Sequence, residues 1–176
     1  MTLLNIVTAP DPILKKPSRE VESVNDSVRV LMKDMLETMY HDSGVGLAAV
    51  QVGIHKQIIV IDLQNDDDDE RRAKDFYPLF LINPKITSVS ENFNVATEGC
   101  LSVPSLRIDV PRPESINISY LNYDGEEREL AAHDWLARVI QHEMDHLTGK
   151  LIIDYLSSIK KEMAISKLKK FKKQLL

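Results

Sequence analysis

The chain has 176 residues, of which 43% are hydrophobic, and this length is typical of one globular domain that buries about two thirds of its unfolded surface. No apolar run reaches the roughly 20 residues that cross a bilayer, and the first residues do not resemble a signal peptide, so we expect neither a membrane protein nor an exported one. The single cysteine, Cys100, excludes an internal disulfide and favours the reducing cytoplasm.

Charge is distributed unevenly along the chain, whose formal net charge is −5. Residues 160–176 contain seven lysines and one glutamate, so this segment carries +6 and the remainder carries −11. Such a basic tail favours an anionic partner such as RNA or a membrane surface, although a solvated helix face has the same composition. The acidic run at 65–72 is too charged to pack, so we expect a surface loop there without a function.

The first predicted element is a helix over residues 25–41, where apolar side chains recur at helical spacing and Asn25 or Asp26 can cap the start. The following segment, SGVGLAAVQVG at 43–53, contains three glycines that end the helix and allow close backbone approach. Strands are expected at 57–62 and at 79–83, the second of which ends at Pro84.

Further alternating segments predict strands at 86–90 and 115–121, and an Asp-Gly turn predicts that 115–121 pairs with 127–132 as a hairpin. A helix follows at about 134–147, ended by Gly149, and a last helix at about 158–173 carries the basic tail. The predicted fold class is therefore α+β, with antiparallel β-sheets packed around the helix of the C-terminal half, an N-terminal helix and a C-terminal helix. We expect residues 1–176 to form a single domain.

The strongest chemical signal is the hexapeptide QHEMDH at 141–146. His142 and His146 are four residues apart, so they share one face of a helix, and Glu143 lies beside the first of them. Two imidazoles on one face can bind one metal ion, with the carboxylate in reach of a water on that ion. Because apolar neighbours place the motif near the core, where unpaired polar groups are costly, the pattern favours a metal site.

Two histidines leave a catalytic metal site one protein ligand short. Asp145 faces away from both of them, so a role in orienting a ligand from behind fits its position better. Cys100 is by default a small buried hydrophobe, yet its thiolate would complete a Cys-His-His site. The residues alone leave Cys100 and several carboxylates open as the third ligand.

Three segments together resemble the three motifs of the peptide deformylases: GVGLAAVQ at 44–51, EGCLS at 98–102 and QHEMDH at 141–146. Their order and spacing are similar to those of the family, as is PDPIL at 10–14, so the resemblance covers essentially the whole chain. It implies a cytoplasmic enzyme that removes the N-formyl group from the N-terminal formyl-methionine of newly made polypeptides and releases formate.

The resemblance implies a metal site with three protein ligands, Cys100, His142 and His146. One divalent ion would be bound, Fe²⁺ in the cell, and Zn²⁺, Ni²⁺ or Co²⁺ could replace it. Glu143 would be the general base and acid that takes a proton from the attacking water and gives it to the departing amine. The Gln51 amide and the backbone N–H of Leu101 would stabilise the negative oxygen of the intermediate.

The same resemblance implies a set of substrate-binding residues: Gly44, Val45, Gly46, Glu98, Arg112, Trp135 and Val139. The two glycines would let their segment lie along a peptide that adds as a strand, although an ordinary glycine turn has the same pattern. Val45, Trp135 and Val139 would line an apolar pocket for the methionine side chain, with plain core packing as the alternative. Arg112 would pair with Glu98 or touch the peptide.

Two positions depart from the family pattern. Ser43 stands where many relatives carry an acidic or amide residue, and Asp134 stands where a glycine is common, at a point where it can cap the metal-binding helix. The segment 64–77 is also longer than in many relatives, and we assign it no role.

Two other functions fit part of the pattern. A zinc peptidase with an HExxH helix takes its third ligand downstream, where only Asp154 and Glu162 are available. An RNA-binding module with a structural metal would need four protein ligands, whereas the sequence offers three. We therefore expect formyl-methionyl nascent peptides as substrates, the ribosome as a candidate partner of the basic C-terminal helix, no membrane partner, and a monomer.

Overall fold

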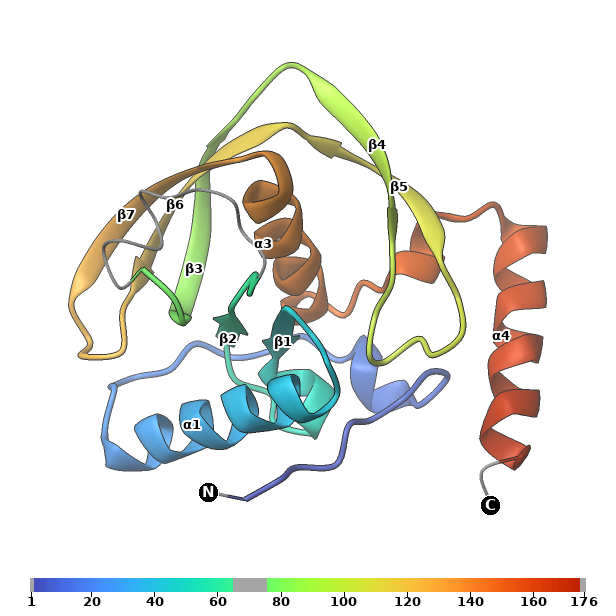
Figure 1. The fold of residues 1–176 in the computed structure, drawn as a ribbon, viewed down its shortest axis with the longest axis horizontal. Helices are drawn as coiled ribbons and strands as arrows, with labels where there is room; N and C mark the ends of the chain where they lie inside the picture. Colours follow the sequence, from blue (N-terminus) through green and yellow to red (C-terminus); the bar gives the residue numbers. More distant parts are fainter. Residues whose placement is uncertain (1, 65–75, 175–176) are drawn as a thin grey trace.

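The computed structural model describes residues 2–64 and 76–174, and within these residues it contains two β-sheets and three α-helices (Figure 1). The acidic run that we predicted as a surface loop, 65–72, lies outside the described residues. In chain order the elements are η1 (Pro12–Lys15), α1 (Asp26–His41), β1 (Gly46–Ala48), η2 (Ala49–Val52), β2 (Ile58–Ile61), β3 (Leu79–Val89), β4 (Phe93–Glu98), β5 (Ile108–Pro113), β6 (Ser115–Leu121), β7 (Glu127–His133), α3 (Asp134–Leu147), η3 (Ile152–Tyr155) and α4 (Ser158–Gln174).

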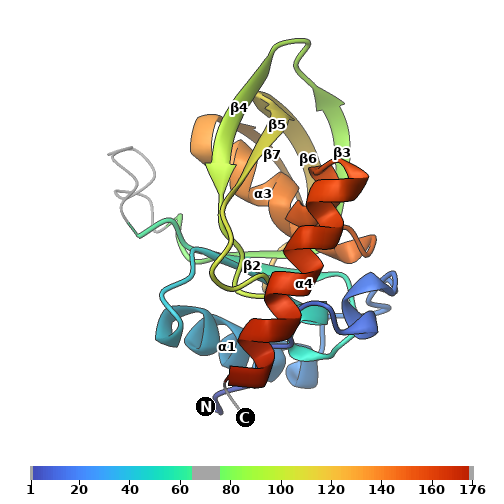
Figure 2. The same ribbon diagram turned by 90° about the vertical axis from the view of Figure 1, so that its right-hand side faces the viewer.

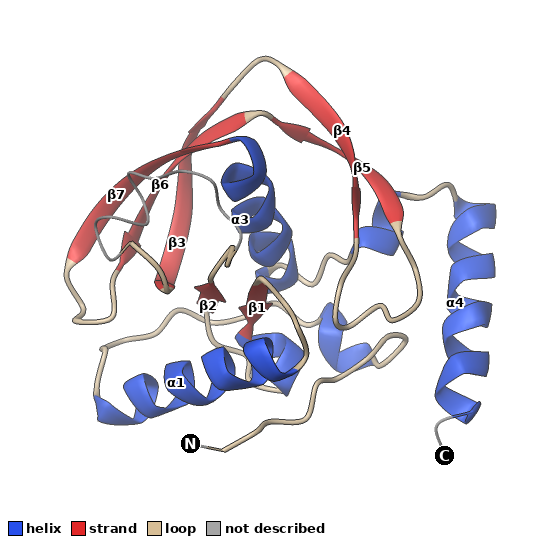
Figure 3. Ribbon diagram, viewed as in Figure 1, coloured by secondary structure: helices blue, strands red, loops and turns tan. Residues whose placement is uncertain are grey.

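The larger sheet has five antiparallel strands in the order β1-β2-β3-β6-β7, and β4 and β5 form a separate two-stranded ribbon. The predicted hairpin is present, since Ser115 pairs with His133 and Leu121 with Glu127 on either side of the Asp-Gly turn. The predicted α+β class with antiparallel sheets is thus confirmed (Figure 3).

The predicted end of a strand at Pro84 is wrong, because β3 continues from Leu79 to Val89 and joins the two segments that we had separated. Proline has no N–H to donate to a β-ladder, which is why it is expected at strand ends and bulges. The pairing of β3 with β6 shifts its register between Ile82 and Lys85, and Pro84 lies within this shift. At this irregular point the strand does not need an N–H donor from residue 84.

Helix α3 lies between the larger sheet and the β4–β5 ribbon (Figure 1). Its apolar side chains, among them Leu136, Ile140 and Leu147, join a buried cluster with Ile59 and Ile61 of β2. Burial of each such side chain contributes about 1.5–3 kcal/mol. The alternate residues of β2 point to the opposite face of the sheet, where α1 packs on them, so helices cover both faces at this end.

The start of α3 differs from our expectation. His133 occupies the N-cap position, and Asp134 has a φ of +53°, in the left-handed region that glycine adopts without steric cost. The predicted cap by Asp134 is therefore wrong, and residue 134 has a backbone conformation that glycine adopts more readily than aspartate.

The helices at the two ends of the chain pack against different parts of the molecule. Helix α1 is capped by Asn25, whose side-chain oxygen accepts the Val28 N–H at 3.1 Å, as predicted. Helix α4 runs along the side of the molecule and buries Ala164 and Leu168 in a cluster with residues around the end of the ribbon (Figure 2). Among the residues that the structure describes, none belongs to a helix that is long and apolar enough to cross a membrane.

Candidate active site

Among the buried polar side chains of helix α3 are those of His142, Glu143 and His146. They lie within one turn of each other, between apolar residues that hold the helix against the sheet. The helix ends where Gly149 adopts a φ of +77°. The local sequence therefore determines both the helix and the shared side of its two histidines.

Cys100 approaches these histidines from the loop after β4. Its Sγ lies 3.3 Å from His146 Nε2, and one donor atom from each of Cys100, His142 and His146 lies within 4.8 Å of the others. The two imidazole rings are 5.2 Å apart. A thiolate and two imidazoles are ligands that Zn²⁺ and Fe²⁺ accept, and three of them leave a coordination position for a water or a substrate.

The surroundings of the two histidines suit metal binding. His142 Nδ1 lies 2.8 Å from Glu98 Oε2, so an N–H on this atom donates to the carboxylate and Nε2 keeps its lone pair for an ion. Burial and nearby positive charge lower the pKa of His146 well below its usual value, which keeps that imidazole neutral, as a ligand must be. These residues therefore fit a divalent cation.

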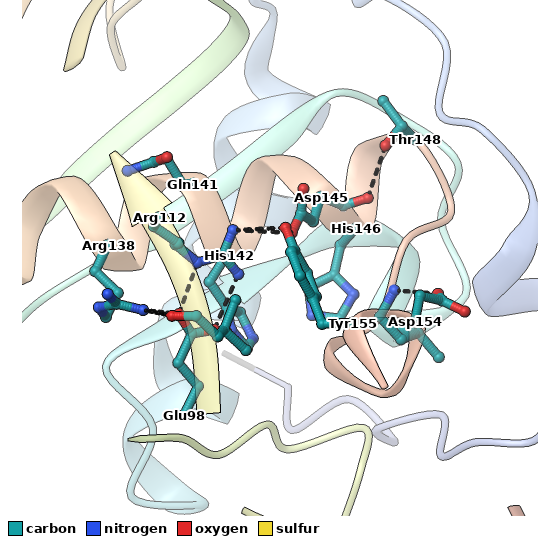
Figure 4. A network of polar contacts seen from close by, with 12 residues as sticks. Glu98, Arg112, Arg138, Gln141, His142, Asp145, His146, Thr148, Asp154 and Tyr155 are labelled. Carbon is teal, nitrogen blue, oxygen red and sulfur yellow. Dashed lines mark hydrogen bonds and ion pairs between the residues drawn. The ribbon is translucent and has the colours of Figure 1, made fainter. Parts of the chain in front are cut away.

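Glu98 is the centre of a buried polar network (Figure 4). Its carboxylate accepts hydrogen bonds from Arg112 at 2.6 and 2.9 Å and from Arg138 at 2.7 Å, besides its contact with His142. Burial by itself raises the pKa of Glu98, but the bonds with Arg112 and His142 lower it to about 2. The carboxylate thus remains charged and fixed behind His142.

Asp145 belongs to the outer part of the same network. Its carboxylate accepts a hydrogen bond from Arg112 at 2.9 Å and from the Tyr155 hydroxyl at 2.7 Å (Figure 4). Asp145 therefore acts on the histidines only through Arg112 and Glu98, from behind, as its position on the helix predicted.

Glu143 is buried beside β1, and its Oε2 has no hydrogen-bond partner among the described residues. Burial raises the pKa of this carboxyl to about 7, the range in which a group can both take and give a proton near neutral pH. Gly46 faces it so closely that a Cβ there would lie 2.5 Å from Glu143 Oε1. Only glycine leaves room for this carboxylate.

Gln51 lies in η2, close to Cys100. Its Oε1 accepts the Ala48 N–H at 2.8 Å, so its amide nitrogen points toward Ser102 Oγ at 3.1 Å and Cys100 Sγ at 3.7 Å. A buried amide donor is therefore aimed at the surroundings of the thiolate.

These groups open into a cavity of about 630 Å³. Of the residues predicted to act on the substrate or the reaction, the following line it: Gly44, Val45, Gly46, Gln51, Glu98, Leu101, Trp135, Val139 and Glu143. Trp135 is 47% exposed at the cavity, whereas Val139 is buried. Arg112 does not line the cavity and contacts Glu98, Asp145 and Tyr155, so of its two predicted roles the geometry favours the ion pair.

The sequence did not predict every residue of this site, and Arg138 is the buried charged residue that was missed. Arg138 is buried, lines the cavity and bonds Glu98 together with two backbone carbonyls of the ribbon. Its only local signal is a charged residue within the apolar stretch of α3, which an exposed helix position would also produce.

The comparisons with known proteins agree with this geometry. The model of the family described as polypeptide deformylase matches residues 3–162. Peptide deformylase 1 of Rickettsia conorii is 59% identical over 172 residues, with 98% of each chain covered, and peptide deformylase of Orientia tsutsugamushi (strain Ikeda) is 51% identical over 175 residues, with 98% of this chain and 97% of that protein covered.

Solved structures give the same result. The crystal structure of peptide deformylase from Ehrlichia chaffeensis is 44% identical, has a TM-score of 0.89 and covers 98% of both chains, and a complex of the Ehrlichia chaffeensis enzyme with actinonin has a TM-score of 0.88 at 46% identity, with 97% of this chain and 98% of that chain covered. The resemblance drawn from three motifs is confirmed, and the zinc peptidase is not favoured. The chain belongs to the polypeptide deformylase family.

Proposed function

We propose that this protein is a metal-dependent hydrolase that removes the formyl group from the N-terminal formyl-methionine of newly made polypeptides and releases formate. The observation that carries the proposal is the convergence of Cys100, His142 and His146 donor atoms within 4.8 Å, beside the buried carboxyl of Glu143. Family membership supports the same reaction. We further propose that residues 1–176 act as one catalytic unit.

The family is metal-dependent, and the proposed ligands of the ion are Cys100, His142 and His146. A bound divalent cation would supply Lewis acidity, which lowers the pKa of a water and polarises a carbonyl. Fe²⁺ is the proposed ion in the cell, with Zn²⁺, Ni²⁺ or Co²⁺ as replacements. The thiolate makes the site sensitive to oxidants, because thiolates react readily with peroxide.

Glu143 is the proposed general base and acid. Its unpaired Oε2 can accept a proton from a water that attacks the formyl carbon, and the protonated carboxyl can then donate to the departing amine. A pKa of about 7 suits both directions of transfer near neutral pH. Expulsion of a neutral amine, rather than an unstable amide anion, requires this second transfer.

Gln51 and the Leu101 N–H are the proposed donors to the oxygen that becomes negative as the formyl carbon is attacked. The bond from Ala48 N–H fixes the Gln51 amide with its nitrogen toward Cys100, so no side-chain rotation is needed during the reaction. Removal of one such donor costs about 2.7–4 kcal/mol in enzymes where it has been measured.

The edge of the larger sheet is the proposed binding surface for the substrate backbone. Within residues 2–64 and 76–174, strand β1 pairs with β2 alone, so its other edge is available to an added strand of peptide beside Gly44 and Gly46. The methionine side chain is proposed to pack against Val45, Trp135 and Val139 at the cavity. Glu98 lines the same cavity and orients His142 through a hydrogen bond, and Arg112 in turn fixes the Glu98 carboxylate.

Release of formate from formyl-Met-Ala tests the proposal, with unformylated Met-Ala-Ser as the substrate for the rival peptidase activity. Metal content is measured on the same anaerobically purified sample. We expect formate release, no cleavage of the unformylated peptide, and loss of activity on chelation. Absence of formate release from metal-loaded protein would refute the proposed reaction.

A substitution at Glu143 separates catalysis from metal binding. We expect Glu143→Gln to lower kcat by roughly 10²–10⁴, the usual contribution of a general acid or base, while the metal content per chain is unchanged. Loss of the metal in this variant would contradict the assignment of Glu143 to proton transfer alone.

We also propose that α4 docks the enzyme on the ribosome, where its substrates emerge in the cytoplasm. The helix is anchored by Ala164 and Leu168, while lysines such as Lys167 and Lys170 are exposed to solvent. Since the chain supplies all three proposed metal ligands itself, a monomer is the proposed functional unit.

Charge reversal tests the docking of α4. We expect Lys167→Glu with Lys170→Glu to weaken co-sedimentation with ribosomes at low salt, because phosphate contacts depend steeply on charge and ionic strength. The matched control reverses the exposed Lys16 and Lys56 instead. Equal co-sedimentation of both double variants and the unsubstituted protein would refute docking through α4.

A further inference from the structure

Arg138 is the one arginine on α3, and it is 6% exposed within an otherwise apolar stretch of the helix. Its Nη1 donates to Glu98 Oε1 at 2.7 Å and to the Val110 carbonyl at 2.8 Å, and its Nη2 donates to the Asn94 carbonyl at 2.7 Å. Burial of a guanidinium is costly unless its planar fork is satisfied, and here three acceptors satisfy it. The role of Arg138 therefore depends on what its three acceptors belong to.

The three acceptors all belong to the β4–β5 ribbon. Asn94 and Glu98 are in β4, and Val110 is in β5, so Arg138 bridges both strands of the ribbon from the neighbouring helix. Among the described residues, backbone bonds join the ribbon to the larger sheet at the end remote from Glu98, where the Ser90 N–H donates to the Ser115 carbonyl and the Glu114 N–H to the Asn92 carbonyl. At the Glu98 end no β-ladder within the described residues fixes the distance of the ribbon from α3.

Polar contacts dominate the boundary between α3 and the ribbon. The apolar side of α3 joins the core cluster of the larger sheet, whereas Ile108 and Val110 of the ribbon belong to a different cluster, with α4 and η3. Besides Arg138, the Gln141 side chain donates to the Pro113 carbonyl at 3.1 Å, and Glu98 meets His142. Arg138 makes the largest number of these contacts.

The position of the ribbon matters because the proposed active site spans this boundary. Strand β4 ends at Glu98 and leads directly into Gly99 and Cys100, while the two histidines are on α3. Thr97, Glu98 and Gly99 also form one wall of the cavity, which Arg138 itself lines. A shift of the ribbon would therefore move a ligand, the carboxylate behind His142 and a cavity wall together.

Arg112 and Arg138 both bond Glu98, but their other contacts differ. Arg112 is part of the ribbon, and its guanidinium bonds the side chains of Glu98, Asp145 and Tyr155. Arg138 bonds the backbone of both strands and lines the cavity.

We propose that Arg138 is a positioning residue for the deformylase reaction: from α3 it fixes the β4–β5 ribbon, and thereby both the Glu98 carboxylate behind His142 and the ribbon wall of the substrate cavity. The proposal rests on the proposed function for its kinetic readout, but not for its effect on metal retention.

Two substitutions separate the two effects. Arg138→Met keeps the length of the aliphatic stem and removes all three bonds, so we expect KM for formyl-Met-Ala-Ser to rise roughly tenfold and metal loss to a chelator to accelerate. Arg138→Lys keeps a single compact charge that can reach Glu98 but cannot span both carbonyls. It should restore slow metal loss while KM stays raised.

The measurements use Ni²⁺- or Co²⁺-loaded full-length protein: KM and kcat, the rate of metal loss to excess EDTA, and the midpoint of thermal unfolding. Arg128→Met is the matched control, since Arg128 is half exposed on β7 and pairs with Glu126. Arg112→Met is the comparator, for which we expect faster metal loss with a smaller change in KM.

The proposal is overturned if Arg138→Met lowers only the unfolding midpoint and leaves KM and metal loss within twofold of the unsubstituted protein. It is also overturned if Arg138→Lys restores KM, because a single charge would then suffice. If Arg138→Met does not fold, the KM of Arg138→Lys decides. If the unsubstituted protein releases no formate, the proposed function fails, and the rates of metal loss still test Arg138.

Discussion

The chemistry of Glu143 is set by the few atoms around it. Apolar burial raises the pKa of its carboxyl to about 7, and Gly46 leaves just enough space for the carboxylate beside β1. The glycine motif and the HExxH helix, nearly 100 residues apart in the chain, are therefore complementary in shape at one contact. Any residue with a Cβ at position 46 would have to displace the Glu143 carboxylate or strand β1.

This complementarity predicts the effect of Gly46→Ala. The added Cβ would lie 2.5 Å from Glu143 Oε1, so the carboxylate must move, and a misplacement of this size can cost up to roughly 10²-fold in rate. We expect kcat to fall by tenfold or more while the metal content stays the same. Gly125→Ala, in the distant β6–β7 turn, should leave kcat unchanged, and an unchanged kcat in Gly46→Ala would contradict the prediction.

Residues that act through a local spacing could be predicted from the sequence, and others could not. His142 and His146 share a side of one helix because the period of the helix requires it. Arg138 was missed because its acceptors in β4 and β5 are 28 to 44 positions away in the chain, so no local pattern reveals them.

Among the elements, α3 depends on both of its ends. It begins at a residue with positive φ, Asp134, and it ends before Gly149, which has a φ of +77°. The backbone of Lys15 in η1 lies directly against Gly149. The end of the helix is therefore also the place where the N-terminal segment is packed.

The two roles of Gly149 predict a large effect of Gly149→Ala. Alanine in the left-handed region costs about 1–2 kcal/mol. Its Cβ would also collide with the Lys15 carbonyl, which can move only if the backbone of η1 moves with it. Gly125→Ala has the same φ penalty, but its Cβ meets only the Val24 side chain at 3.3 Å. Urea unfolding should show a larger loss of stability for Gly149→Ala, and equal losses would refute the role of the Lys15 contact.

Strand β3 illustrates why element boundaries were less predictable than element types. The proline rule placed the end of a strand at Pro84, because proline cannot donate to a regular ladder. The register shift against β6 removes that requirement, and a shift of register is a property of two paired strands rather than of one sequence segment.

In the part of the molecule that the structure describes, the core consists of three buried clusters, and polar contacts at their edges join distant parts of the chain. One of these contacts joins three parts of the chain at Asp154, whose carboxylate pairs with Lys15 of η1, accepts the Leu151 N–H at 2.8 Å and pairs with Lys161 of α4 at 2.6 Å. Burial raises the pKa of Asp154, but these bonds lower it below its usual 3.8 overall.

The lowered pKa predicts a pH-dependent stability. Because the folded-state pKa of Asp154 is below the unfolded-state value, its contribution is fully present above about pH 4 and is lost as the pH falls through the folded-state pKa. Asp154→Asn should be less stable than the unsubstituted protein at pH 7, and the difference in urea midpoint should shrink below pH 4. A difference that is constant from pH 7 to pH 3 would contradict this contribution.

The sequence alone determined the α+β class, the helices at 26–41, 134–147 and 158–174 within one residue, the β6–β7 hairpin, and the three motifs that resemble the family. These features depend on local periodicity and turn residues, which a single segment carries. Only the tertiary structure decided that Cys100 lies 3.3 Å from His146 and that the Glu98 carboxylate bonds His142 instead of facing solvent. It also decided that Arg138 bridges the ribbon to α3. Those contacts join distant segments, and the packing of α3 between the sheet and the ribbon is what brings them together.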